Sequence, residues 1–122
     1  MHRILLVDDD DPFRTMLHKT LERAGYEVQD APNGRVALAL YLENPGALII
    51  TDLVMPEKEG LETILELRRN HPGAKIIAIS GGGRMNAKVN LVMAEKLGAT
   101  RTLAKPFSQQ ELFDAVSNVL AA

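Results

Sequence analysis

The chain has 122 residues, 46% of them hydrophobic and 25% charged, with a formal net charge of −2 and no cysteine. This composition is typical of a soluble domain with its own core, and we expect a single domain over residues 1–122. It excludes a disulfide framework and a thiolate metal site, and the small aromatic share of 4% argues against direct nucleic-acid binding through basic grooves and stacking rings. No apolar run approaches the ~18 residues of a transmembrane helix, so we expect a cytoplasmic domain without membrane contact.

Residues 4–7 form the first short apolar run, which predicts a strand, and a helical pattern follows it up to Gly25. The predicted inward face of this helix contains Phe13, Met16, Leu17, Leu21 and Ala24. Pro12 suits the first helical position, and Gly25 suits the left-handed residue that closes a helix. We therefore predict Asp11 as the N-cap and Asp10 as a solvated loop charge.

The same alternation continues to the end of the chain. Strands are predicted at 26–31, 47–50, 75–79 and 100–104, and helices at about 33–43, from Leu61 to the His71-Pro72 stop, at about 86–97 and from Ser108 onward. In the helix that begins at Leu61, the predicted inward residues are Leu61, Ile64 and Leu65, after a loop that includes Gly60. Asn33 is a predicted N-cap, Gly98 is a predicted helix end, and Ser108 with Glu111 forms a predicted capping box.

Five strand and helix units predict an α/β fold, a (βα)5 doubly wound parallel sheet with helices on both faces. The runs at 4–7 and 47–50 are continuously aliphatic, as is 75–79 after Lys75, which is typical of central strands, whereas 26–31 and 100–104 carry polar residues, as edge strands do. These patterns favour the flavodoxin-like strand order 2-1-3-4-5. In that order the winding reverses between the first and third strands, and ligands bind there at the carboxyl ends.

Polar residues follow the predicted strands at this edge of the sheet. They are Asp8 and Asp9 after the first strand, Asp52 after the third, Ser80 after the fourth and Lys105 after the fifth. Two carboxylates ~4 Å apart repel by roughly 4 kcal/mol at an effective dielectric of ~20, so a cation is expected between them. Oxygen ligands without His or Cys select a hard ion, and a few carboxylates with open water positions suit Mg²⁺ better than Ca²⁺.

A carboxylate beside Mg²⁺, a lysine and a serine is equipped for phosphoryl transfer. Asp52 is the natural nucleophile because it is the single acid next to its strand end, whereas Asp8 and Asp9 can bind metal as a pair. Taken alone, Asp52, Ser80 and Lys105 each have an ordinary structural explanation as a turn residue, a loop hydroxyl or a solvated lysine. The prediction depends on their combination. The three histidines, His2, His18 and His71, show no ligand spacing and are expected to have structural roles.

The segments ILLVDDD, LIITDLVMPEKEG, IIAISG and LAKPF together resemble the receiver domain of bacterial two-component response regulators, of the chemotaxis-regulator type, over essentially the whole chain. The resemblance implies that Asp52 accepts a phosphoryl group from a sensor histidine kinase or phosphotransfer protein. It also implies a conformational change on the face formed by the fourth strand, the fourth helix and the fifth strand. A phosphorylation-dependent homodimer is a further expectation, and the downstream protein partner is unknown.

The same resemblance implies roles for the residues around Asp52. Asp9, Asp52 and the backbone carbonyl of Val54 would ligate Mg²⁺, with Asp8 contacting it mainly through water. Ser80, Lys105 and the backbone N–H groups of Val54 and Gly81 would bind the phosphoryl oxygens. The Lys105-Pro106 bond is expected to be cis.

The sequence also departs from the family pattern. Thr102 stands where many receivers have an aromatic switch residue, so that switch is in doubt here. Val54 and Gly82 offer no polar group to position an attacking water, which predicts slow to moderate self-dephosphorylation. The apolar residues of the helix at 86–97 exceed a single core stripe, and we favour a wide buried face over an interaction surface.

Two other functions compete with this interpretation. Phosphatases of the haloacid-dehalogenase type also begin with a strand and an acid pair, matched here by Asp8 and Asp10, but they need a second acidic pair where this chain has only Glu111 and Asp114 on its last helix. That alternative leaves Asp52 without a role. A receiver that binds proteins without being phosphorylated is the other alternative. We favour a stand-alone receiver over a module of a longer chain.

Overall fold

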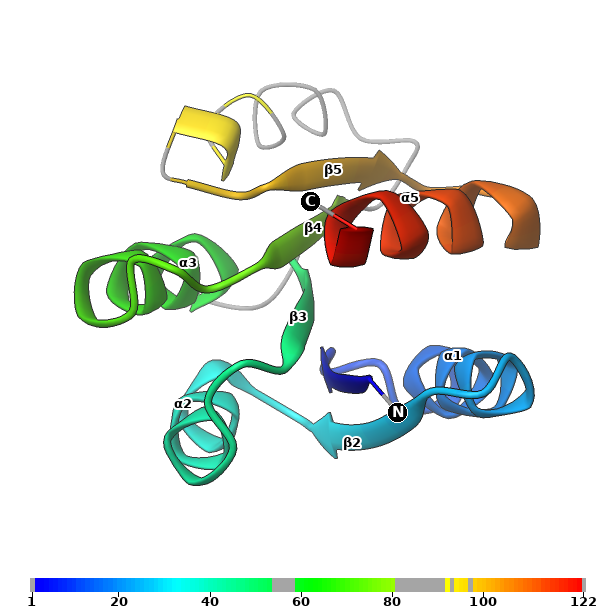
Figure 1. Cartoon of the computed structure of the whole chain (residues 1–122), viewed down its shortest axis with the longest axis horizontal. Helices are drawn as coiled ribbons and strands as arrows, with labels where there is room; N and C mark the ends of the chain where they lie inside the picture. Colours follow the sequence, from blue (N-terminus) through cyan, green and yellow to red (C-terminus); the bar gives the residue numbers. More distant parts are fainter. Residues whose placement is uncertain (1, 54–58, 81–91, 93, 97, 122) are drawn as a thin grey trace.

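One parallel sheet with helices on both faces forms the protein (Figure 1). The computed structural model describes residues 2–53, 59–80, 92, 94–96 and 98–121. The strands are β1 (Arg3–Val7), β2 (Glu27–Ala31), β3 (Leu48–Asp52), β4 (Ile76–Ser80) and β5 (Arg101–Ala104). The helices are α1 (Asp11–Arg23), α2 (Gly34–Glu43), α3 (Glu59–Asn70) and α5 (Gln109–Ala121). The helix predicted at 86–97 lies mostly outside the described residues.

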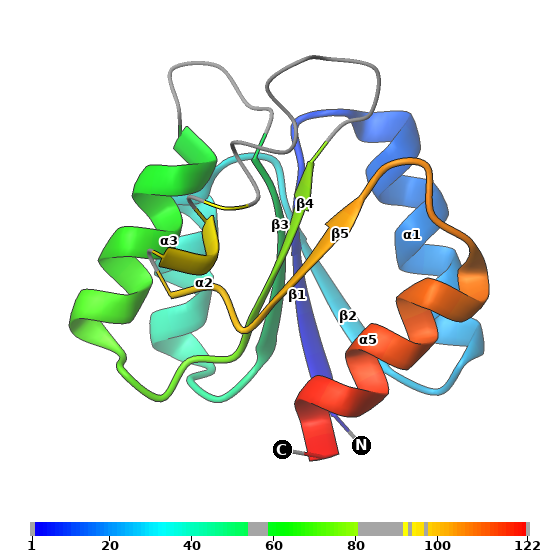
Figure 2. The same ribbon diagram turned by 90° about the horizontal axis from the view of Figure 1, so that it is seen from above.

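The strand order is β2-β1-β3-β4-β5, and all neighbouring strands are parallel, which confirms the predicted topology. Helices α1 and α5 cover one face of the sheet and α2 and α3 the other (Figure 2). Every residue of the central strands β3 and β4 is buried. Their aliphatic runs contact helices on both faces, which is why they show no alternation of polar residues.

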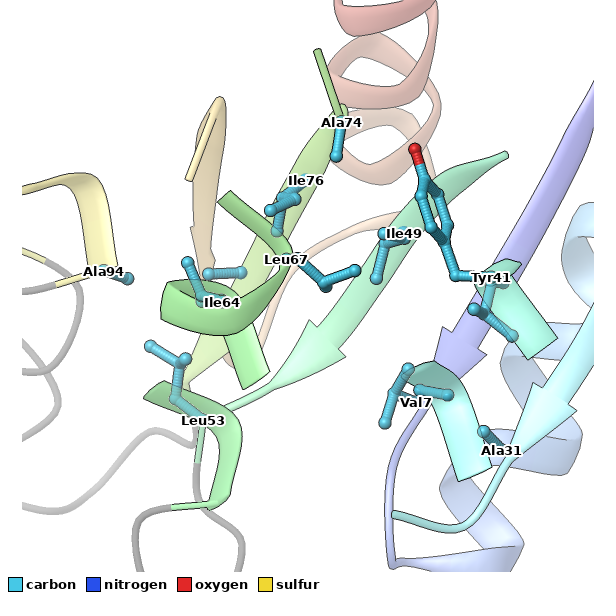
Figure 3. Packing of buried hydrophobic residues seen from close by; sticks show 13 residues of the cluster. Val7, Ala31, Tyr41, Ile49, Leu53, Ile64, Leu67, Ala74, Ile76 and Ala94 are labelled. Carbon is cyan, nitrogen blue, oxygen red and sulfur yellow. The ribbon is translucent and has the colours of Figure 1, made fainter. Parts of the chain in front are cut away.

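Two clusters of buried side chains form the core, one on each face of the sheet. Successive strand residues point to opposite faces, so Leu5 and Val7 of β1 belong to one cluster and Ile4 and Leu6 to the other. Figure 3 shows the first cluster, where Leu67 of α3 and Tyr41 of α2 pack against the sheet. The two clusters fix the sheet between its helix layers and so determine which strand ends come together.

The predicted helix caps are confirmed at two helices. The side chain of Asn33 accepts a hydrogen bond from the backbone N–H of Val36 at the start of α2. At α5, the backbone N–H of Glu111 donates to the Ser108 hydroxyl, and the Ser108 N–H donates to the Glu111 carboxylate, at 3.0 and 3.1 Å. Gly25 has a left-handed φ of +99°, as a helix-closing glycine requires.

The predicted start of α1 is wrong by one residue. Asp10, not Asp11, is the N-cap, because its carboxylate accepts the backbone N–H of Phe13 at 3.1 Å. Asp11 is the first helical residue and forms an ion pair with Arg14 at 2.6 Å. Both aspartates have a favourable local sequence, and the first turn selects the one whose carboxylate reaches an N–H three residues later.

Four smaller predictions also fail. Met16, Ala24 and Leu65 are predicted to face the core, but all three are exposed, Met16 and Leu65 at 52% and 40%. In α3 the buried positions are Ile64 and Leu67, and Leu65 lies about 100° around the helix from Ile64, toward solvent. Gly60 belongs to α3 and not to the loop before it, because the helix begins at Glu59.

Candidate functional site

Asp8 and Asp52 lie at the carboxyl ends of adjacent strands. Val7 pairs with Thr51 in the sheet, so Asp8 and Asp52, each one residue further on, come out at the same edge. Asp8 is 2% exposed and Asp52 4% exposed. The aliphatic run predicted β3 to end at Ile50, but the strand continues through Thr51 and Asp52, which are polar yet buried. The crevice predicted at the reversal of winding therefore contains two buried carboxylates.

Lys105 supplies the positive charge beside this pair. Its Nζ atom is 2.9 Å from Oδ2 of Asp52 and 3.9 Å from Oδ2 of Asp8. The backbone N–H of Lys105 donates to the carbonyl of Ser80 at 2.8 Å, which holds the lysine at the end of β4. The Lys105-Pro106 peptide bond is cis, as predicted. A lysine ammonium thus bridges strand ends from both halves of the sheet.

Ser80 places an unused hydroxyl at the same edge. It is fully buried as the last residue of β4, and its predecessor Ile79 pairs with Asp52 of β3. Among the described residues, no group hydrogen-bonds its Oγ atom. A buried hydroxyl without a partner costs free energy, roughly 1–3 kcal/mol. An oxygen atom of a ligand at this strand end would relieve that cost.

The pKa of Asp8 reflects the burial and the charges of this pocket. Burial, together with the nearby Asp52 carboxylate and a hydrogen bond to it, raises the pKa of Asp8 from 3.8 to about 7. The backbone N–H of Asp10, 2.9 Å from Oδ1 of Asp8, and the Lys105 ammonium lower that pKa but do not cancel the rise. When both acids are ionised, they carry two negative charges against the single charge of the lysine, so the pocket favours either a proton on Asp8 or an additional cation.

Asp9 is the one remaining side chain of the predicted site that the structure describes. Asp9 is exposed, and no group of three or more His, Cys, Asp or Glu side chains suited to a metal ion occurs among the described residues. The structure thus brings Asp8 and Asp52 together without Asp9 as a third carboxylate. Val54 and Gly81 lie outside the described residues, as does Gly82.

Sequence reasoning missed two side chains that contact this pocket. Phe13 places its ring under Lys105, with Nζ 3.9 Å from the ring centroid. Arg14 is largely buried and donates to the backbone carbonyl of Asp8, with its other nitrogens facing Asp11 and Asp30. Both follow the acidic run directly on α1, and this position next to the strand end is the only sequence signal that could have indicated them.

Two of the histidines have structural contacts, in line with their predicted roles. His18 Nδ1 is 2.5 Å from Oδ1 of Asp30, and this hydrogen bond raises the pKa of His18 above 6.5. The ring of His71 packs edge-to-face on Tyr41, with centroids 4.9 Å apart. Thr102, at the position of the missing aromatic switch, donates from Oγ1 to the Glu95 carboxylate at 3.3 Å.

In the described part of the chain, no helix is long and apolar enough to span a membrane.

Comparison with known proteins identifies the class that this fold and site define. Residues 4–117 match the response regulator receiver domain, and the chain belongs to this family. It is 36% identical to the chemotaxis protein CheY of Thermotoga maritima, with 96% of each chain covered. It is 37% identical to the DNA-binding transcriptional regulator NtrC of Azospirillum brasilense and 36% to the regulatory protein CpxR of Klebsiella pneumoniae, but spans only 24% and 50% of their lengths.

Solved structures agree with this assignment. A response regulator receiver domain protein from Clostridium thermocellum has a TM-score of 0.90 at 29% identity, covering 99% of this chain and 95% of the other. A putative response regulator from Chloroflexus aurantiacus has a TM-score of 0.89 at 34% identity, covering 99% and 98%. The protein is therefore a two-component receiver domain, a class that acts with histidine kinases and not as a metabolic enzyme. This rules out the phosphatase alternative.

Proposed function

We propose that Asp52 is the phosphoryl acceptor of this receiver. The observation that carries the proposal is the buried Asp52 carboxylate, held 2.9 Å from the Lys105 ammonium beside a second buried acid. The Ser80 hydroxyl at the next strand end, which has no hydrogen-bond partner among the described residues, supports it. These groups provide one nucleophile and two donors for phosphoryl oxygens, which is the set that acyl phosphate formation needs.

In the proposed reaction, an Asp52 carboxylate oxygen attacks the phosphorus of a phosphohistidine. The new O–P bond forms as the P–N bond breaks, and the imidazole nitrogen leaves with the electron pair and takes up a proton. The Lys105 ammonium, which faces Asp52 at rest, then pairs with a phosphoryl oxygen, and the Ser80 hydroxyl donates to another. Positioning and charge neutralisation supply most of the rate in reactions of this type.

We propose Mg²⁺ as the cofactor. The raised pKa of Asp8 supports a cation at this pocket, and donors that are all oxygen atoms fit Mg²⁺. Asp8, Asp9 and Asp52 would hold the ion with the backbone carbonyl of Val54. When bound, it would neutralise charge on the transferring phosphoryl group. Asp9 is the least supported of these ligands because its side chain is exposed.

The proposal is tested by the intact mass of the protein after incubation with acetyl phosphate. We expect the wild type to gain one phosphoryl group only when Mg²⁺ is present, and the Asp52→Asn variant to gain none. Asp114→Asn, which removes an exposed carboxylate from α5, is the matched control and should be labelled like the wild type. Labelling of Asp52→Asn at the wild-type level would contradict the assignment. Failure of the wild type to bind Mg²⁺ would favour the receiver that is not phosphorylated.

Further proposals concern the fate of the phosphoryl group. We propose that the receiver hydrolyses its acyl phosphate itself, slowly, because Val54 and Gly82 carry no polar side chain. Decay of the labelled mass after removal of acetyl phosphate measures this rate, and loss of the label within seconds would contradict the proposal.

We also propose that the receiver acts in the cytoplasm as one domain over residues 1–122. The face that changes conformation on phosphorylation would consist of β4, β5 and the helix predicted between them. We propose no direct binding to nucleic acid.

A further inference from the structure

We propose that Phe13 is a positioning residue that holds the Lys105 ammonium at the acid pocket through a cation–π contact. The inference extends the proposed function, because it assigns to the first turn of α1 a part in phosphoryl transfer through Lys105. It depends on a contact between segments 92 residues apart in the chain (105 minus 13), which no local sequence pattern shows.

The geometry of the contact is within the range for cation–π attraction. The Nζ atom of Lys105 lies 3.9 Å from the centroid of the Phe13 ring, well inside the limit of about 6 Å. The same Nζ atom is 2.9 Å from the Asp52 carboxylate. The ammonium is thus held between an aromatic ring and the proposed phosphoryl acceptor.

The ring of Phe13 is itself fixed on several sides. Its backbone N–H is bonded to the Asp10 cap, which sets the first turn of α1. Its ring meets that of Phe107 edge-to-face, with centroids 6.3 Å apart and planes at 80°. Both rings pack against the core cluster between the sheet and helices α1 and α5. Because Phe107 comes two residues after Lys105, the contact between the two rings joins the first turn of α1 to the segment that carries the lysine.

A neutral ring suits this role better than an additional carboxylate would. Lysine has a flexible four-carbon stem, and the side chain of Lys105 is 22% exposed, so solvent competes for its ammonium. The face of the Phe13 ring attracts the ammonium without neutralising its charge. Lys105 can therefore exchange the Asp52 carboxylate for a phosphoryl oxygen while it remains over the ring.

The test replaces Phe13 with phenylalanines that carry one, two or three ring fluorines, at nearly constant shape. Each fluorine weakens the negative face of the ring while its size and burial stay nearly the same. We expect the rate of labelling by acetyl phosphate at saturating Mg²⁺ to fall progressively, by roughly 3- to 10-fold for the trifluorinated ring. Phe13→Leu should be at least as slow. Phe113→Leu, which removes a ring from the same core cluster, is the matched control and should label at the wild-type rate.

A second measurement detects the contact between Phe13 and Lys105 independently of phosphoryl transfer. The ring current of Phe13 should shift the NMR signals of the Lys105 ε-methylene protons upfield, and Phe13→Leu should abolish that shift. Equal labelling rates across the fluorine series would overturn the positioning role, and an unshifted Lys105 signal in the wild type would overturn the contact. If the wild type is not labelled at all, the proposed function fails, and the NMR signal still decides whether Phe13 holds Lys105.

Discussion

At the scale of single residues, Asp8 is a carboxylic acid that the fold removes almost completely from water. Its carboxyl is buried beside Asp52 and has a pKa of about 7, against an ordinary value of 3.8. Between these two values the folded, metal-free protein keeps a proton that the unfolded chain releases. The stability that this proton provides is complete below pH 3.8 and is lost as the pH rises to about 7. Metal binding at the pocket must displace the same proton.

Asp8→Asn should therefore stabilise the metal-free protein at pH 8, by about 1–3 kcal/mol, since each pKa unit corresponds to about 1.4 kcal/mol. The amide has no charge to bury and can still accept the N–H of Asp10. Urea unfolding between pH 4 and pH 8 measures the effect, and the fall in stability seen for the wild type should be smaller in the variant.

Mg²⁺ should affect the stability of the wild type and of Asp8→Asn differently. The ion should stabilise the wild type more at pH 8 than at pH 6, because protons compete with it for Asp8, and should stabilise Asp8→Asn little at either pH. A variant less stable than the wild type at pH 8 without metal would show that Asp8 is not held in a pocket short of positive charge.

At the scale of elements, the start of α1 connects the acidic run to the site. Its N-cap, Asp10, lies between the proposed metal ligands and the Phe13 turn, so the cap sets the position of both. Asp10→Ala should lower the free energy of unfolding by about 1 kcal/mol. Asp11→Ala is the matched control, since it removes the ion pair of the exposed Asp11 carboxylate with Arg14, worth about 1 kcal/mol or less, and leaves the cap in place.

Urea unfolding of the two variants at pH 8 distinguishes the caps. If Asp11→Ala lowered the free energy of unfolding more than Asp10→Ala, the N-cap of α1 would be Asp11, as the sequence predicts. The sequence could not separate these two neighbours, because both precede Phe13 closely and both are good cap residues. Asn33 and Ser108 are predicted correctly because neither has a second Ser, Thr, Asp or Asn at an adjacent position.

At the scale of the whole molecule, the strand order follows from the sequence because β1, β3 and β4 each contain an uninterrupted aliphatic run while β2 and β5 do not. That order by itself places Asp8, Asp52 and Lys105 at one edge of the sheet. Contacts between side chains did not follow from it. The ring of Phe13 under Lys105 and the exposed position of Asp9 depend on the exact path of the β1–α1 connection, which hydrophobic periodicity does not specify.

The central claim is that Asp52 alone carries the phosphoryl group, and locating the label tests it most directly. The protein is labelled with acetyl phosphate and Mg²⁺, the acyl phosphate is reduced with borohydride, and the digested peptides are sequenced by mass spectrometry. Reduction converts a phosphorylated aspartate to homoserine and so marks its position permanently. We predict homoserine at position 52 and at no other aspartate. Homoserine at Asp8 or Asp9, or labelled protein without homoserine at position 52, would contradict the account.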